Sequence, residues 1–212
     1  MNTKLPLTLH NDSLCENLFE MLQSKIRWTR LYIVLIMTFT CSLSQGQSLN
    51  KNWKEDLTLT LEQFLQCTSS SSDKTLCASF IEKSLASVYK IDALNVEASV
   101  NKSPALGLAN NKGSQWSVVG MAFDQKALES AQRFANENKA VIAVYKPTGE
   151  DVKHVALILP GSLQHSGSWG YNVPNSASFF LMSPERSYID KALSYAFAKN
   201  MLLYVTLYVR NK

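Results

Sequence analysis

The segment from Met201 to Val209 constrains the fold of this chain more than any other. Its odd-numbered positions are aliphatic residues or methionine, and Tyr204, Thr206 and Tyr208 occupy positions between them. Because successive side chains of a strand point to opposite faces, this alternation predicts a strand with two distinct faces. The chain is therefore expected to contain a sheet.

Other segments complete the expected order of elements. Three further strands are predicted at Ala140–Tyr145, His154–Leu159 and Ser176–Met182, with turn residues between the first two. Apolar residues at helical spacing predict four helices: Trp53–Cys67, a segment from near Thr75 to Val88, a segment after Asp124 that ends at Asn136, and Glu185–Lys199. The stretch between Asn95 and Ser117 has the composition of a loop. Helices mostly precede an antiparallel sheet, which is an α+β arrangement.

Composition and charge exclude several classes of protein. Of 212 residues, 46% are hydrophobic and 18% are charged, which suits one or two globular domains and excludes a disordered or fibrous chain. The net charge of +4 is dispersed, without a basic stripe along one helix or face. A nucleic-acid partner is therefore not expected.

The N-terminal part resembles a targeting segment. Lys25, Arg27 and Arg30 precede the short apolar run Leu31–Phe39, and small or polar residues follow from Ser42 to Gly46. This order is typical of a secretory signal peptide. We expect residues 1–46 to be a leader, with Met21 as an alternative start, and residues 47–212 to be one secreted or periplasmic domain that leaves the membrane after cleavage. An uncleaved anchor is the alternative.

The mature part contains only two cysteines and two histidines, so few side chains could act as a thiol nucleophile or as an imidazole base. Cys67 and Cys77 could form a disulfide, as pairs in exported chains often do. Alternatively, Cys77 lies in the first turn of the helix expected near Thr75, where the helix dipole would lower the pKa of its thiol. His154 begins a strand and could serve such a thiolate as a base.

Several short segments, taken in order, resemble a known family. They are Cys77-Ala78-Ser79-Phe80, the helix that leads into VIAVY, then HVALILPG and SGSWG. From Leu76 to Val209 this order is similar to the papain-like peptidoglycan hydrolases of the NlpC and CHAP kind. The resemblance implies N-terminal helices packed on an antiparallel sheet, and hydrolysis of an amide bond in peptidoglycan, either within the stem peptide or between it and muramic acid. Lys153 departs from the glycine that many members have before the histidine.

The resemblance also implies catalytic roles. Cys77 would be the nucleophile and His154 the general base and then the general acid. For the residue that orients His154, strand pairing makes Ser178 the closest candidate by position. Asn175 is chemically better suited, and His165 would be placed there by a shorter hairpin.

The remaining expectations concern ligands. Trp169, with Ser168 beside it on a Gly-flanked loop, is either a substrate platform or a core anchor. No metal or other cofactor is expected, because two histidines without an acidic cluster do not make a zinc site. The expected partner is a peptidoglycan peptide or glycopeptide, and the sequence identifies no inhibitor or immunity protein. The rival hypothesis is a non-catalytic exported binding module on the same scaffold, with Cys67 bridged to Cys77.

Overall fold

The computed structural model describes residues 48–91 and 116–211, which lie in one compact unit, Gly46–Lys212. The predicted leader and its cleavage site lie outside the described residues. So does most of the predicted loop between Asn95 and Ser117, although Trp116 and Ser117 belong to a strand.

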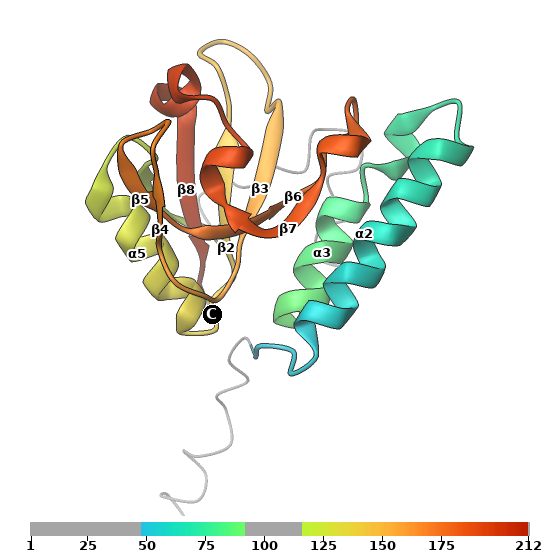
Figure 1. Ribbon diagram of the computed structural model, residues 1–212, viewed down its shortest axis with the longest axis horizontal. Helices are drawn as coiled ribbons and strands as arrows, with labels where there is room; N and C mark the ends of the chain where they lie inside the picture. Colours follow the sequence, from blue (N-terminus) through green and yellow to red (C-terminus); the bar gives the residue numbers. More distant parts are fainter. Residues whose placement is uncertain (1–47, 92–115, 212) are drawn as a thin grey trace, which may run out of the picture. The chain divides into compact units, whose positions relative to one another are not determined.

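A six-stranded antiparallel sheet forms the centre of this unit (Figure 1). Its strand order is β1-β8-β2-β3-β6-β7, and β4 and β5 form a separate two-stranded sheet. The strands are β1 (Trp116–Met121), β2 (Val141–Tyr145), β3 (His154–Ile158), β4 (Gln164–Ser166), β5 (Tyr171–Val173), β6 (Asn175–Ser178), β7 (Tyr188–Ala192) and β8 (Val205–Arg210).

Helices cover both faces of the sheet (Figure 1). On one face lie α2 (Trp53–Ser70), the 3-10 helix η1 (Lys74–Cys77) and α3 (Phe80–Tyr89). On the other lie α5 (Gln125–Asn136) and the short 3-10 helix η5 (Leu193–Tyr195). Two further 3-10 helices, η4 (Pro184–Arg186) and η6 (Lys199–Tyr204), belong to connections between strands. The sheet therefore separates two apolar cores.

Strand alternation divides the residues of β3 between these two cores. Ala156 and Ile158 pack in the core beneath α5, whereas Leu157 packs in the core beneath α2 and α3. At the end of α3, the buried Tyr89 hydroxyl donates a hydrogen bond of 2.8 Å to the Ile158 carbonyl, and burial raises the pKa of Tyr89. This contact fixes α3 against β3.

The two helices with clear apolar stripes agree with the sequence. The Asp124 carboxylate accepts a hydrogen bond from the backbone N–H of Lys126, so Asp124 caps α5 as predicted. The helix predicted at Trp53–Cys67 corresponds to α2, which continues to Ser70. The coarse α+β class is confirmed, with helices on both faces of an antiparallel sheet.

The prediction of a helix at Glu185–Lys199 is wrong. The segment instead contains most of η4, then β7 and η5. Residues of β7 pair with β6, and Asp190 takes a left-handed conformation with φ of 59°. Pairing along the sheet edge overrides the helical spacing, because the backbone of β7 forms its hydrogen bonds with β6. A local sequence pattern does not reveal this partner.

Strand boundaries also differ from expectation. The strand predicted at Met201–Val209 begins only at Val205, since Met201–Tyr204 belong to η6. The strand predicted at Ser176–Met182 is the shorter β6. Strand β1 was not predicted. Its register with β8 shifts between Val118 and Gly120, and this irregularity interrupts the two-residue period that would have revealed it.

Candidate functional site

His154 is the first residue of β3 and contacts a serine of the neighbouring strand. Its Nε2 lies 2.6 Å from the Ser178 hydroxyl oxygen, and Ser178 pairs with Ala156 two residues along β3. Residues two apart on a strand share a face, so the pairing of β3 with β6 brings the two side chains together. The positional expectation for Ser178 thus agrees with the structure.

Aromatic rings enclose the imidazole. The Phe180 ring stacks on it with centroids 4.3 Å apart, and the Phe197 ring meets it edge-on at 5.6 Å. On Phe180 lies the Arg186 guanidinium, with its Cζ 4.8 Å from the ring centroid. Burial, and to a smaller extent the positive charge of Arg186, lower the pKa of His154 to about 4. The imidazole is therefore neutral near pH 7.

Cys77 is bonded to Cys67 through a disulfide whose cysteines are 10 residues apart. Cys77 is completely buried and is the last residue of η1, whereas α3 begins at Phe80. The expectation that Cys77 lies in the first turn of this helix is therefore wrong, because the 3-10 turn capped by Asp73 ends before α3 starts. The bridge stabilises the fold by about 2–3 kcal/mol, if loop-closure entropy is the main contribution.

The structure does not bring Cys77 and His154 together. Cys77 packs in the core beneath α2 and α3, together with Leu157 of β3. The rings that enclose His154 belong to the core beneath α5. The sheet lies between the sulfur and the imidazole, and no hydrogen bond joins them among the described residues.

The other two candidates for orienting His154 have different partners. The Asn175 amide nitrogen donates to Asp190 Oδ1 at 2.6 Å and to the Pro160 carbonyl at 3.3 Å. The backbone carbonyl of Asn175 accepts a hydrogen bond from the N–H of Leu159, which follows the end of β3 opposite to His154. His165 is exposed in the separate β4–β5 sheet. Neither contacts His154, because the longer loop after β3 places Ser178 there.

Of the two interpretations of Trp169, the structure favours the core anchor. The side chain is 2% exposed, and its Nε1 donates to the Phe197 carbonyl at 3.0 Å. Ser168 is exposed, and its hydroxyl oxygen lies 3.2 Å from that of Ser166. A ring enclosed in this way has no face left for a sugar or peptide.

The surroundings of His154 include residues that the sequence did not indicate. Phe180, Arg186 and Phe197 come from connections that follow β6 and β7. Arg186 and Phe197 lie within the segment interpreted as one helix, so their contacts around His154 were not predicted. The run Ser178-Phe179-Phe180 at the end of a strand is the sequence feature that could have indicated an aromatic contact with His154.

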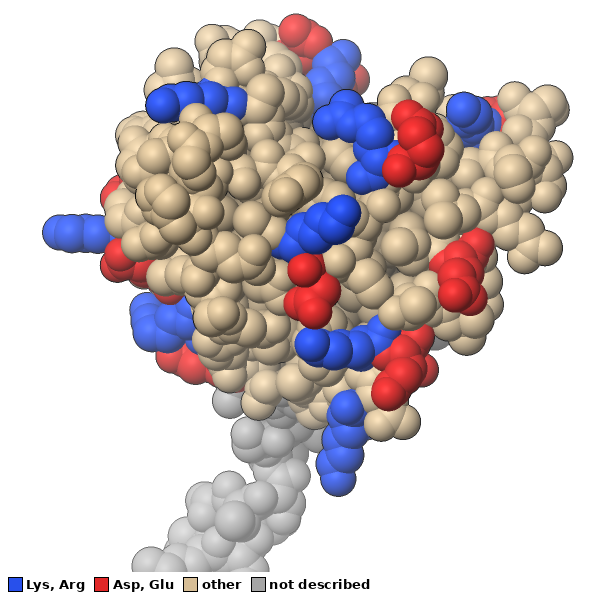
Figure 2. Space-filling model, in the orientation of Figure 1, with Lys and Arg blue, Asp and Glu red and all other residues tan. Residues whose placement is uncertain are grey.

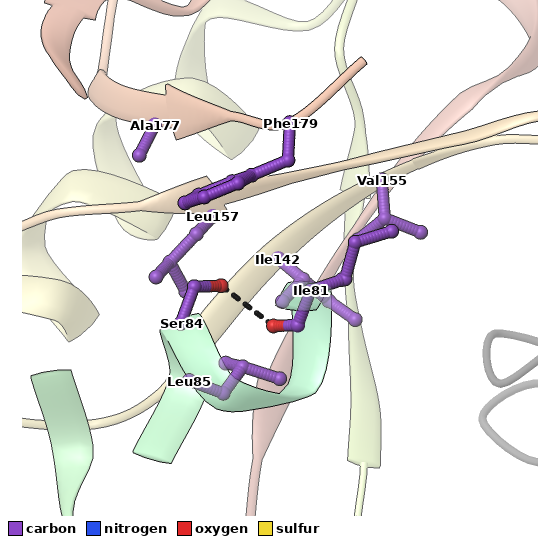
Figure 3. Close-up of a pocket in the computed structure, with 8 residues that line it drawn as sticks. All are labelled: Ile81, Ser84, Leu85, Ile142, Val155, Leu157, Ala177 and Phe179. Carbon is purple, nitrogen blue, oxygen red and sulfur yellow. Dashed lines mark hydrogen bonds between the residues drawn. The ribbon is translucent and has the colours of Figure 1, made fainter. Parts of the chain in front are cut away.

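A hollow lies between α3 and the sheet, on the Cys77 face (Figure 3). Its volume is about 10 Å³, which is room for about one water molecule. The lining side chains are Ile81, Ser84, Leu85, Ile142, Val155, Leu157, Ala177 and Phe179. The Ser84 hydroxyl donates to the Ile81 carbonyl at 2.6 Å within α3. Neither Cys77 nor His154 lines this hollow, which offers apolar contact rather than a catalytic group.

The comparisons with known proteins identify no family. No protein-family model matches the chain, and no curated protein matches it. Within residues 48–91 and 116–211, no three His, Cys, Asp or Glu side chains form a group that could hold a metal ion. No helix in this described part is long and apolar enough to cross a membrane.

Proposed function

We propose that the domain is a non-catalytic exported module that binds the peptide part of peptidoglycan. The observation that carries the non-catalytic assignment is the Cys67–Cys77 disulfide. A cysteine hydrolase attacks with a thiolate, and a sulfur held in a disulfide cannot attack. In this form the bridge stabilises the fold instead of supplying a nucleophile.

The position of the sheet supports the same proposal. Reduction of the bridge would free the Cys77 thiol in the core beneath α2 and α3, while His154 faces the opposite core. A base must lie within hydrogen-bond reach of the proton that it accepts, directly or through one water. Reduction alone therefore does not assemble a Cys–His pair.

The ligand class rests on the sequence resemblance to papain-like peptidoglycan hydrolases. A module on a related scaffold would retain the capacity to recognise stem peptides without cleaving them. Export, expected from the leader, would bring it to the compartment that contains this ligand.

The second candidate is the thiol-dependent hydrolase itself, acting on an amide bond in peptidoglycan. The observation in its favour is the 2.6 Å contact between His154 Nε2 and Ser178. In a catalytic site, such a contact holds the imidazole in one orientation and leaves Nδ1 to face a nucleophile. This candidate requires both reduction of the bridge and a rearrangement that brings Cys77 to the other face.

Three measurements on the chain from Gln47 to Lys212 distinguish the candidates. Without reductant, we expect no alkylated thiol, retention on sedimented peptidoglycan sacculi, and no release of soluble fragments with new amino groups. After reduction with dithiothreitol and unfolding in urea, two thiols should react, because Cys77 is buried in the folded domain. With dithiothreitol alone, fragment release should still be absent. Release that is lost in both Cys77→Ala and His154→Ala would overturn the non-catalytic proposal and establish the hydrolase. Failure to sediment with sacculi would overturn the proposed ligand.

A further inference from the structure

Two exposed cations that follow β6 in the chain lie over aromatic rings. The Lys191 Nζ lies 5.5 Å from the centroid of the Tyr195 ring, and the Arg186 Cζ lies 4.8 Å from that of the Phe180 ring. We call Phe180, Arg186, Lys191 and Tyr195 the aromatic–cation surface. All four residues follow β6 in the chain, and the pairing of β6 with β7 brings them to the α5 face of the sheet.

Contacts of buried and partly buried rings link the Lys191–Tyr195 pair and the Arg186–Phe180 pair to β6. Tyr188 contacts Tyr195 with ring centroids 6.0 Å apart, and its hydroxyl lies 2.9 Å from the Ser176 hydroxyl. Phe180 stacks on His154, which contacts Ser178 on the same strand as Ser176. These packing contacts therefore fix the positions of the residues of the aromatic–cation surface.

The two cations have no acidic partner in the described part of the chain. The ion pairs found there involve other basic residues, and Glu185 does not pair with the adjacent Arg186. The nearby Asp190 is already engaged, because its carboxylate accepts hydrogen bonds from Lys54 and Asn175. On the face of the molecule that Figure 2 shows, basic and acidic side chains are mixed, without a wide area of one sign. The site is therefore suited to a small anionic group rather than to a polyanion.

Exposure at this surface fits a ligand that combines charge with apolar parts. The Tyr195 residue is 62% exposed although its ring is large. An exposed ring beside an unpaired ammonium or guanidinium can pack against a peptide while the cation binds a carboxylate.

We propose that the aromatic–cation surface binds a carboxylate-bearing stem peptide, with Arg186 and Lys191 contacting carboxylates and Tyr195 packing on the peptide. The assignment rests on the proposed function and specifies where its ligand binds. The peptide of peptidoglycan contains several carboxylates, which can accept hydrogen bonds from two exposed cations that have no ion pair within the described residues.

The test measures binding of the soluble tripeptide L-Ala-γ-D-Glu-meso-diaminopimelate to the mature chain by calorimetry. Lys191→Gln, Arg186→Gln and Tyr195→Ala should each weaken binding by about threefold to tenfold, the range expected for one exposed charged or stacking contact. The same tripeptide with its carboxyl groups amidated should bind at least about tenfold more weakly, because it lacks the charged acceptors.

Lys83→Gln is the matched control. Lys83 also lies over a ring, with its Nζ 4.2 Å from the Phe80 centroid, but on the opposite face of the sheet. The Lys83→Gln variant should bind the tripeptide with the same affinity as the wild type. Thermal unfolding checks that Arg186→Gln remains folded, since Arg186 packs on Phe180.

The outcomes are distinguishable. If the wild type binds sacculi and tripeptide but none of the three variants weakens binding, this surface is not the site, and the proposed function stands. Equal weakening in Lys83→Gln would also overturn the assignment, because the effect would reflect net charge alone. If the wild type binds neither sacculi nor tripeptide, the proposed function itself fails.

Discussion

The imidazole Nε2 of His154 and the hydroxyl oxygen of Ser178 lie 2.6 Å apart on the neighbouring strands β3 and β6. Phe180 covers one face of the imidazole, and Phe197 meets it edge-on. A proton added to this ring would create a charge among apolar groups and near Arg186. The packing of the β6–β7 connection therefore depends on the protonation state of His154.

The first prediction concerns pH. The pKa of His154 is lowered from 6.5 to about 4, so the unfolded chain binds the proton more readily than the folded one. The contribution of the neutral His154 imidazole to the free energy of unfolding is fully present above pH 6.5 and is lost as the pH falls toward 4. It amounts to at most about 3 kcal/mol. Urea unfolding at several pH values should show a smaller loss for His154→Gln than for the wild type. The exposed His165→Gln is the control, and should follow the wild type.

The second prediction concerns Ser178. Its side chain is 1% exposed and contacts His154, so Ser178→Ala should lower the free energy of unfolding by about 1–2 kcal/mol through the loss of a buried hydrogen bond. Chemical denaturation at pH 7 measures the loss. Ser168→Ala, at an exposed position, should change stability by less than about 0.5 kcal/mol. Equal effects for the two serines would contradict the assigned contact.

The third prediction concerns the disulfide. Cys67→Ala should lower the free energy of unfolding by about 2–3 kcal/mol, because the loop between the cysteines is no longer closed in the unfolded chain. When Cys77→Ala is introduced into the Cys67→Ala variant, the free energy of unfolding should fall by less than when Cys77→Ala is introduced into the wild type. The reason is that the Cys67→Ala variant already lacks the bridge. Additive effects in denaturant unfolding would show that the two cysteines are not linked.

The fourth prediction compares an amide with an ion pair. Asn175 is buried and donates hydrogen bonds to Asp190 and Pro160, so Asn175→Ala should lower stability by about 2 kcal/mol. Lys54→Ala removes the exposed ion pair with Asp190 and an exposed contact of the Lys54 ammonium with the Trp53 ring, and should cost about 1 kcal/mol or less. Thermal or urea unfolding ranks the two variants, and the reverse order would contradict this account of the β7 edge.

The fifth prediction concerns glycine. At Gly120, φ is +154°, and an added Cβ would lie 2.6 Å from the Ala127 Cβ of α5. Gly120→Ala should therefore lower stability by more than about 2 kcal/mol, because the helix must move. Gly149→Ala, at φ of +76° with open space around the position, should incur only the conformational cost of about 1 kcal/mol. Similar losses for both variants would show that the contact with α5 is not limiting.

Much of the fold could be predicted from local patterns. The apolar stripes of α2 and α5 and the Asp124 cap identified two helices, and the short apolar runs of β2 and β3 identified two central strands. These elements were predictable because each buries one continuous stripe or run, which leaves a strong periodic signal. The β7 segment was not, since its backbone hydrogen bonds go to β6, a partner that helical spacing does not reveal.

The alternation in β3 already placed His154 and Leu157 on opposite faces of a strand, and the sequence by itself determined this. Which helices cover each face was decided only by the tertiary structure. It packs α3 and Cys77 against the Leu157 face, and Phe180 and Phe197 around His154 on the other. The pairing of Cys77 with Cys67, rather than with His154, follows from this packing, because chemistry between two side chains requires contact in space and their spacing along the chain does not supply it.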